Sequence, residues 1–323
     1  MAAPTAEELG SDRGTFARIL DDYASLQGFL FILPTFTLLS VILFWPMLQD
    51  GLFLSFHEYT ISLNEPNPWV GLGHYEYWLT GAGSNLLYFS IKQTILYEFV
   101  VVPLDLIVAL SVALVLNEDF PGRWFWRGFA LTGYASPTVL AGLVFAVMSD
   151  ARSYGVIYQL FVFIFEDLLG FLGINVPDSG GLTSNTPWAF WAIVFAKVWR
   201  DFGFMFIIIL AGLQSIPSDL YEIAKVDGAG PIQRFRHITL PHLSTVIVTV
   251  VMIRTVFTVG KLEIPYAMTR GGPVNYTSFL AMLMFKASSG FRENLGRTAA
   301  LGVMFVTVLV PLIAMWIKLE TED

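Results

Sequence analysis

The sequence predicts an all-α, polytopic membrane protein with about six transmembrane helices. Of its 323 residues, 55% are hydrophobic and only 14% are charged, whereas a soluble domain of this length needs more charged surface. Aromatic residues make up 15% of the chain, which suits lipid-facing surfaces and interfacial belts. We therefore predict a polar N-terminal segment, residues 1–27, followed by a transmembrane domain in contact with lipid, residues 28–323.

The N-terminal segment is expected to form a short amphipathic helix at the membrane surface. Phe16, Ile19, Leu20 and Tyr23 recur there at helical spacing. The segment is acidic and has no small-residue cleavage site, so it does not resemble a secretory signal.

Six apolar stretches of roughly twenty residues, the length that crosses a hydrocarbon core, are the predicted spans. They run approximately from Leu26 to Leu48, Phe89 to Leu116, Gly128 to Met148, Trp188 to Leu210, Ser244 to Tyr266 and Gly296 to Ile317. The stretch from Tyr154 to Leu172 is interrupted by Glu166, Asp167 and Gly170, which predicts an interfacial helix rather than a seventh span.

The distribution of basic residues favours a cytoplasmic N-terminus and, with an even number of spans, a cytoplasmic C-terminus. The first predicted outer loop, Asp50 to Tyr88, has no Lys or Arg and the second has only Arg152, whereas the predicted cytoplasmic segments hold eight basic residues. Arg270, Lys286 and Arg292 in the third outer loop run against this trend. The expected location is the cell membrane, with several passes.

The segment 215–241, between the fourth and fifth spans, predicts two short helices around a turn. Pro217 suits a helix start, and Gly228 permits the left-handed conformation that ends a helix. Pro231 can open the second helix, and Pro241 is expected to limit it before the next span. Such a compact helix pair is shaped to dock into a groove on a partner.

An apolar face on the first of these helices is expected from Leu220, Ile223 and Ala224. The Glu222–Ile223–Ala224 sequence, followed by Gly228 and then by Ile238, Leu240 and Pro241, resembles the EAA motif of ABC importer permeases. Ile223 departs from the alanine that is frequent in that family, and this enlarges the docking face. Thr269–Arg270–Gly271–Gly272–Pro273, with Thr277 beyond it, and Ala211–Gly212–Leu213 resemble the carbohydrate-uptake branch, which includes maltose-type and glycerol-phosphate-type permeases.

The resemblance implies that the segment 215–241 is a cytoplasmic coupling helix that sits in a cleft of an ATPase subunit. The residues assigned to coupling are Glu222, Ala224, Asp227, Gly228, Ala229, Phe235, Ile238, Leu240 and Pro241. The implied partners are a second homologous permease, two ATP-binding subunits, an extracellular solute-binding protein and a sugar, with no nucleic acid. Gly260–Lys261 is followed by Leu262 and does not form a phosphate-binding loop, so ATP and Mg²⁺ are expected on the partner ATPase and no cofactor on this chain.

Ionisable residues within the predicted spans are costly and need a partner, water or a solute. They include Glu98, Asp105 and Lys197, and the residues that we assign to a substrate pathway are Trp199, Arg200, Asp201, Arg254, Lys261 and Glu263. Trp199 beside Arg200 and Asp201 combines an aromatic face with hydrogen-bonding groups, which suits a sugar. The alternative for each charge is pairing between helices.

Other functions remain open from the sequence. A permease of the same fold could carry glycerol phosphate, a polyamine, a peptide or another small solute. An integral membrane enzyme would need a cluster of catalytic groups, but the sequence shows no catalytic set and no metal spacing among its four His, and it contains no Cys. A self-contained channel would not need a docking segment.

Overall fold

The computed structural model describes residues 31–59, 68–152, 154–168, 171, 173, 175–290 and 295–322. The predicted amphipathic helix within residues 1–27 lies outside these residues. Over the described residues the chain is helical, and its only strand-like pairing is an isolated bridge between His57 and Trp69. The all-α prediction is confirmed.

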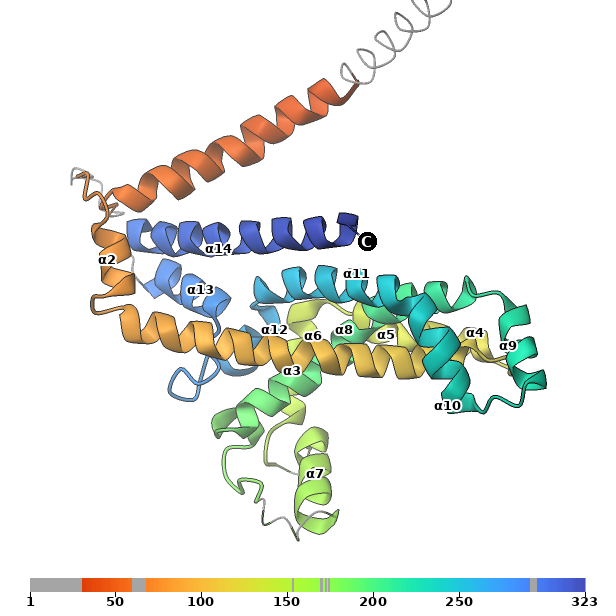
Figure 1. Ribbon diagram of the computed structural model, residues 1–323. Helices are drawn as coiled ribbons and strands as arrows, with labels where there is room; N and C mark the ends of the chain where they lie inside the picture. Colours follow the sequence, from red (N-terminus) through yellow and green to blue (C-terminus); the bar gives the residue numbers. More distant parts are fainter. Residues whose placement is uncertain are drawn as a thin grey trace, which may run out of the picture. The chain divides into compact units, whose positions relative to one another are not determined.

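Figure 1 shows the helices of the described residues, coloured in the order of the sequence. Labels with η mark π-type or 3₁₀ turns. The elements are η1 Ser40–Phe44, η2 Met47–Phe53, η3 Leu54–Phe56, α2 Gly73–Leu79, α3 Ser84–Asn117, α4 Arg123–Ala130, α5 Thr132–Ala135, α6 Thr138–Met148, α7 Val156–Val162, η4 Phe163–Leu168, η6 Leu182–Ser184, α8 Trp188–Gln214, α9 Ser218–Val226, α10 Pro231–Arg234, η7 Phe235–Thr239, α11 Leu240–Val259, α12 Glu263–Thr269, α13 Leu280–Gly290 and α14 Leu295–Glu322.

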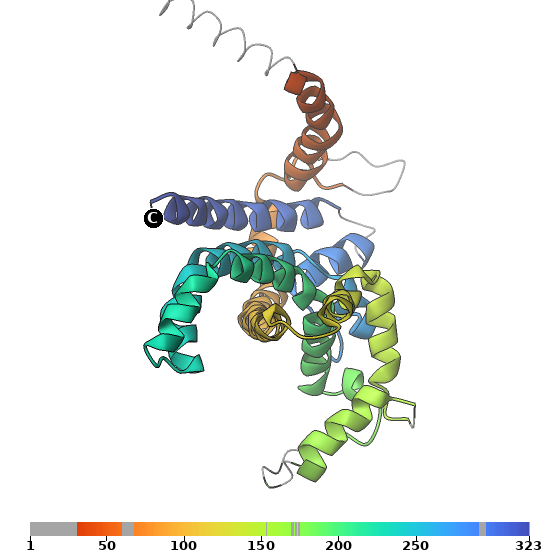
Figure 2. The ribbon, with the colours of Figure 1, turned by 90° about the vertical axis from the view of Figure 1, so that its right-hand side faces the viewer.

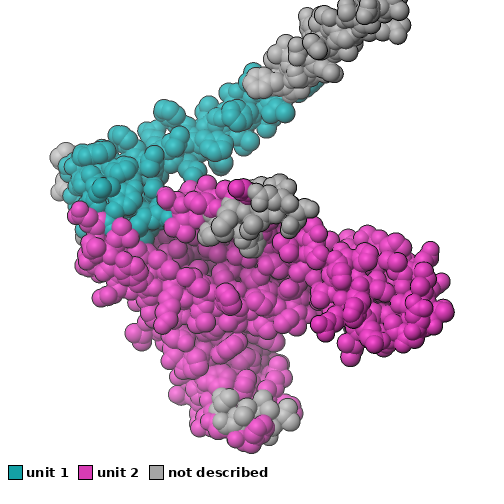
Figure 3. Space-filling view, in the orientation of Figure 1, with its two compact units in different colours: residues 1–75, 292–304 teal, residues 76–291, 305–323 magenta. Residues whose placement is uncertain are grey.

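The chain divides into two units (Figure 3). Unit 1 comprises residues 1–75 and 292–304, and unit 2 comprises residues 76–291 and 305–323. In unit 1, the helical stretch Phe31–Phe56 ends at Phe56. The ring of Phe56 stacks on that of Trp69, with 5.3 Å between the ring centroids. The amide of Leu295 donates a 2.9 Å hydrogen bond to the carbonyl of Tyr59, which joins the two sequence segments of this unit.

Three helices in the described part of the chain are long and apolar enough to cross a membrane by length and composition: Phe31–Phe56, Ser84–Asn117 and Pro231–Val259. Two more helices are of similar length, α8 with 27 residues and α14 with 28. By contrast, α7 has only 7 residues and η4, which follows it directly, has 6. The two together form about 20 Å of helix. That length is shorter than a hydrocarbon core of about 30 Å, as expected of a segment that is not a seventh span.

The third predicted span is not one continuous helix. The structure divides it into α4, α5 and α6. Ser136, which precedes Pro137, is extended, with ψ of 141°. A proline ring disfavours a helical conformation at the residue before it, so α5 ends at this point. The fifth predicted span also ends early, since α11 stops at Val259 and a separate helix, α12, begins at Glu263.

Pro241 does not end the second helix of the segment 215–241, contrary to expectation. The helix runs without a break from Pro231 to Val259. Pro241 lies in the first turn of α11 directly after η7, a π-type turn over Phe235–Thr239. Because a proline ring crowds the carbonyl four residues before it, a widened turn at this point lets the helix continue.

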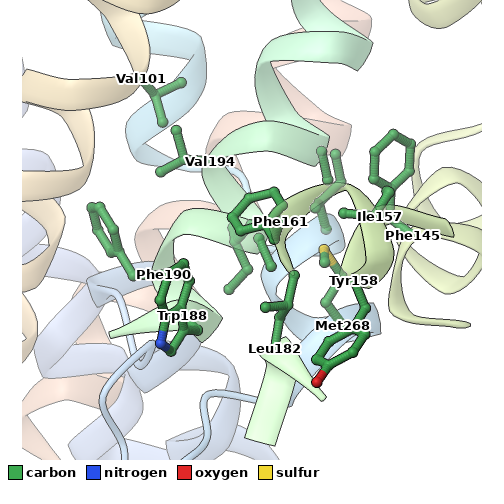
Figure 4. Close-up of a cluster of buried hydrophobic side chains, with 14 of the residues drawn as sticks. Val101, Phe145, Ile157, Tyr158, Phe161, Leu182, Trp188, Phe190, Val194 and Met268 are labelled. Carbon is green, nitrogen blue, oxygen red and sulfur yellow. The ribbon is translucent and has the colours of Figure 1, made fainter. Parts of the chain in front are cut away.

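The core of unit 2 consists of α3, α8 and α11, which pack against one another. In Figure 2, α3 is seen almost end-on beside them. One hydrophobic cluster gathers side chains from α3, α6, α7, α8 and α12, among them Val101, Phe161, Phe190 and Met268 (Figure 4). A second cluster, nearer to α9 and α10, includes Ala109, Phe206, Leu213 and Leu243. Both clusters hold the helices on which the candidate sites lie.

Candidate coupling segment and intramembrane charge cluster

A glycine-based motif ends α9 in the segment 215–241. The amide of Gly228 donates to the carbonyl of Lys225 (3.1 Å), and the amide of Ala229 donates to that of Ala224 (2.8 Å). This pair of bonds satisfies the last carbonyls of a helix when the residue after the cap is left-handed. Gly228 has φ of +78°, so the conformation expected for it is confirmed.

The second helix begins two residues after this turn. The amide of Gly230 donates a 2.8 Å hydrogen bond to Oε1 of Gln233, and Pro231 occupies the first turn of α10. The hydroxyls of Tyr221 and Thr239 lie 2.9 Å apart and link α9 to η7. The helix pair is therefore a folded unit fixed to the end of α11 rather than a loose loop.

The expected apolar face of α9 is divided in the structure. Leu220 packs against the second hydrophobic cluster, whereas Ile223 is 60% exposed. Val226, at the end of α9, is 88% exposed, and Ile232 in α10 is 81% exposed. Apolar side chains at three positions of this small helix pair thus have little cover within the chain.

Most of the residues that the sequence assigns to coupling surround one hollow of about 470 Å³. Its lining residues are Ala224, Asp227, Gly228, Ala229, Gln233, Arg234, His237 and Ile238. Glu222 is exposed, Phe235 is half-buried, and Leu240 and Pro241 are exposed at the start of α11. The structure therefore brings together Ala224, Asp227, Gly228, Ala229 and Ile238, while their role in coupling stays a prediction.

The intramembrane charges gather at the junction of α3, α8 and α11. Arg254 donates from Nε to Oδ2 of Asp105 (2.7 Å) and from Nη2 to Oδ2 of Asp201 (2.7 Å). Nζ of Lys197 lies 2.8 Å from the same oxygen of Asp201, and Arg200 pairs with the other oxygen. Arg254 and Asp201 are only 2% and 1% exposed, so these charges satisfy one another away from solvent.

The other residues assigned to a substrate pathway lie outside this ion-pair cluster. Trp199 is 40% exposed and lines an apolar groove of about 790 Å³ together with Trp126, Phe129 and Phe202. Lys261 is half-buried, with Nζ 6.0 Å from the centre of the Phe257 ring.

Sequence reasoning did not assign Asp105 and Lys197 to a site, although both complete the cluster. Lys197 and Asp201 are four residues apart on one helix, and that spacing is a signal that identifies such a pair. Asp105 comes from 149 residues away, so nothing local predicts its partner. Among the described residues, the buried oxygens that have no hydrogen-bond partner include both of Glu98, Oδ1 of Asp105 and Oε2 of Glu263.

Comparison with known proteins accounts for this architecture. Residues 105–318 match the family model described as a binding-protein-dependent transport system inner membrane component. The chain is 35% identical over 258 residues to the trehalose/maltose transport system permease protein MalF of Thermococcus litoralis, an alignment that covers 80% of this chain and 82% of the relative. It is 34% identical over 311 residues to the sulfoquinovosyl glycerol transport system permease protein SmoG of Agrobacterium fabrum, with 95% of each chain covered.

The fold is also similar to that of a solved structure. A chain in the crystal structure of a bacterial ABC transporter involved in the import of the acidic polysaccharide alginate matches with a TM-score of 0.69 at 19% identity, and the match covers 94% of this chain and 99% of that one. The sequence motif, the membrane-spanning helices and these matches agree: the chain belongs to the family of binding-protein-dependent transport system inner membrane components, the permease subunits of ABC importers.

Proposed function

We propose that this permease forms half of the translocation pathway for a sugar or oligosaccharide and that the segment 215–241 couples the pathway to a separate ATPase. The relatives at 35% and 34% identity are named for trehalose and maltose and for a sulfoquinovosyl glycerol, which are sugars or sugar derivatives. Identity over most of both chains supports a solute of the same chemical class here.

The exposed apolar residues of the segment 215–241 are the observation that carries the coupling role. Val226, Ile232 and Ile223 are 88%, 81% and 60% exposed. They lie on α9, which follows the long helix α8, and on α10, which leads into the long helix α11. Burying one such side chain contributes about 1.5–3 kcal/mol. A short helix with an uncovered apolar surface is suited to a groove on a partner, and the partner proposed here is the ATP-binding subunit.

The assembly that follows from this role contains a second homologous permease, two ATP-binding subunits and an external solute-binding protein. ATP and Mg²⁺ bind to the ATPase subunits in this scheme. The segment 215–241 then lies in the cytoplasm, together with both termini of the chain. Closure of the ATPase subunits moves the segment and converts the pathway from inward-facing to outward-facing, as a rigid-body motion of helices.

Within the membrane, Lys261, Glu263 and Trp199 are proposed to contact the solute. Lys261 lies over an aromatic ring, and Oε2 of Glu263 is a buried acceptor without a partner among the described residues. Arg200, Asp201 and Arg254 already pair with other charges. In this proposal they contact the solute only after exchanging those partners.

The test is isolation of the complex from cells that express this chain with its genomic neighbours. We expect an affinity tag on this chain to retain a second permease and an ATPase. The reconstituted complex should take up the sugar that its binding protein binds, in an ATP-dependent manner. Transport by the isolated chain without an ATPase would contradict the proposal, and a binding protein that takes only a non-sugar solute would contradict the substrate class.

A further inference from the structure

Glu98 on α3 is an intramembrane carboxylate with no role in the coupling segment or in the ion-pair cluster. Both of its carboxylate oxygens are shielded from solvent and have no hydrogen-bond partner among the described residues. A buried charge is strongly unfavourable unless it is paired, and most buried polar groups have a partner. Glu98 therefore needs a partner that the arrangement in this structure does not supply.

The cations of the neighbouring cluster are distributed unevenly over its carboxylates. Oδ2 of Asp201 lies 2.8 Å from Nζ of Lys197 and 2.7 Å from Nη2 of Arg254. The other oxygen of Asp201 pairs with Arg200. Within the cluster three cations thus face two carboxylates, one on α3 and one on α8, and Glu98 is the carboxylate that would balance the third charge.

The position of Glu98 on α3 directs it toward this cluster. Glu98 and Asp105 are seven residues apart, so they lie on one face of the helix, separated by about 10 Å along its axis. The charges of Arg254 and Lys197 both act on the Glu98 carboxylate, but among the described residues no ion pair joins either of them to it. Glu98 therefore borders the cluster without being bonded to it.

Lys197 lies on the side of the cluster that is nearer to Glu98. The rings of Tyr97 on α3 and Phe190 on α8 meet edge to face, with centroids 6.2 Å apart. Further along both helices, their two aspartates share Arg254, so α3 and α8 run in the same direction. Lys197 precedes the aspartate of α8 by one turn, and this displaces it toward the level of Tyr97 and Glu98.

Lys197 is also the cation of the cluster that is best able to change its partner. It shares one carboxylate oxygen with Arg254, and Asp201 would still hold two arginines if Lys197 left. A lysine carries a compact charge on a flexible stem, whereas a guanidinium is a fixed planar fork. Side chains on a helix lean toward its N-terminus, which for Lys197 is the direction of Glu98.

We propose that Glu98 is a positioning residue of the transport cycle, the carboxylate to which Lys197 moves from Asp201 when α8 shifts along α3. This inference rests on the proposed function, which supplies the two states of the pathway. The arrangement in this structure is assigned to the nucleotide-free state, and the pair of Lys197 with Glu98 to the state with closed ATPase subunits. Exchange of one ion pair for another gives two discrete packed arrangements, which is what alternating access requires.

Three substitutions separate this exchange from a merely structural role. Glu98→Gln keeps the size of the side chain and removes its charge, so only the second arrangement loses an ion pair. Lys197→Gln removes the other member of the same pair. Glu118→Gln is the matched control, because Glu118 is an exposed carboxylate at the C-terminal end of α3, and it should behave as wild type.

The experiment uses the complete transporter in lipid nanodiscs with the binding protein purified with its sugar. The readouts are stimulated ATP hydrolysis and the thermal unfolding temperature, measured without nucleotide and with a non-hydrolysable ATP analogue that keeps the ATPase subunits closed. For Glu98→Gln we expect stimulated hydrolysis to fall about tenfold, a coupling within the usual range for contacting residues. The unfolding temperature without nucleotide should be unchanged or higher, and the analogue should raise it less than in wild type.

The double variant Glu98→Gln/Lys197→Gln tests the pairing itself. Because both single variants break the same ion pair, we expect the double variant to lose no more activity than either one. If the two losses multiply to about a hundredfold, the residues act separately and the pairing is wrong.

The remaining results are equally decisive. If the wild-type complex is not stimulated by its loaded binding protein, the proposed function fails. If the wild type is stimulated and Glu98→Gln is stimulated to the same extent, Glu98 has no part in the cycle. If Glu98→Gln instead prevents assembly or lowers the unfolding temperature without nucleotide, the carboxylate is already bonded in that state, and the exchange is overturned.

Discussion

Nε of Arg254 donates a 2.7 Å hydrogen bond to Oδ2 of Asp105, a residue 149 positions earlier in the chain. The guanidinium also donates to Asp201, so one side chain of α11 is bonded to α3 and to α8. All three residues are buried, in surroundings where an unpaired charge is strongly unfavourable.

Replacing Arg254 by Met should destabilise the folded permease by about 3–5 kcal/mol, because Asp105 is then left as an uncompensated buried charge. We expect a clear fall in the thermal unfolding temperature of the purified complex. The double variant Arg254→Met/Asp105→Met removes the orphaned carboxylate and should recover much of that loss. A double variant as unstable as the sum of the two single variants would show that the two residues do not interact.

Gly228→Val should impair coupling, because a β-branched residue opposes φ of +78° at a cost of about 1–2 kcal/mol. A Cβ at Gly228 meets no atom within 4 Å, so the effect comes from the backbone and not from a clash. We expect lower transport and lower solute-stimulated ATP hydrolysis, with normal insertion in the membrane. Gly228→Asn is the matched control and should retain most activity, since asparagine tolerates this conformation. Equal activity of the Val and wild-type proteins would refute the coupling assignment.

Val226→Asp should weaken the contact with the ATPase subunit, because a charge then replaces an apolar side chain that is 88% exposed in the chain itself. We expect less ATPase to co-purify with the tagged permease. Ser218→Asp, a substitution at another exposed position at the start of the same helix, is the control and should have little effect. Glu222→Ala should lie between the two, because it removes a polar contact that we expect with the ATPase subunit and leaves the apolar surface intact.

The topology can be tested by labelling single cysteines, since the chain contains none of its own. Cysteines at Ser11, Glu322 and Lys225 should react only when the reagent can enter the cytoplasm, and a cysteine at Asp178 should react from outside. Reaction of Asp178 and Lys225 from the same side would contradict the predicted number of spans.

Local features of the fold could be predicted from the sequence because their causes are local. Gly228 ends α9 through its own backbone conformation, and Pro217 precedes the first residue of that helix. The outcome at Pro241 could not be predicted in this way. A widened turn before the proline leaves the helix continuous, and sequence patterns do not separate this arrangement from a helix end.

Long-range features were beyond sequence reasoning for a different reason. Intramembrane charges are costly wherever they occur, so Asp105 and Arg254 each signal a need for a partner, but only the packing of α3 against α11 shows that they satisfy each other. The helix α13 was also missed, because Leu280–Gly290 has 11 residues and is too short to be read as a span.

The unbroken helix from Pro231 to Val259 can transmit a movement from one of its ends to the other as a rigid rod. Its first turn carries Ile232, part of the proposed docking surface, and its far part carries Arg254, with no irregular chain between them. Over about 44 Å of helix, a tilt of about 5° displaces one end by about 4 Å relative to the other. Because Arg254 is bonded to α3 and α8, we expect such a tilt, if it is driven at the proposed docking surface, to move all three helices together.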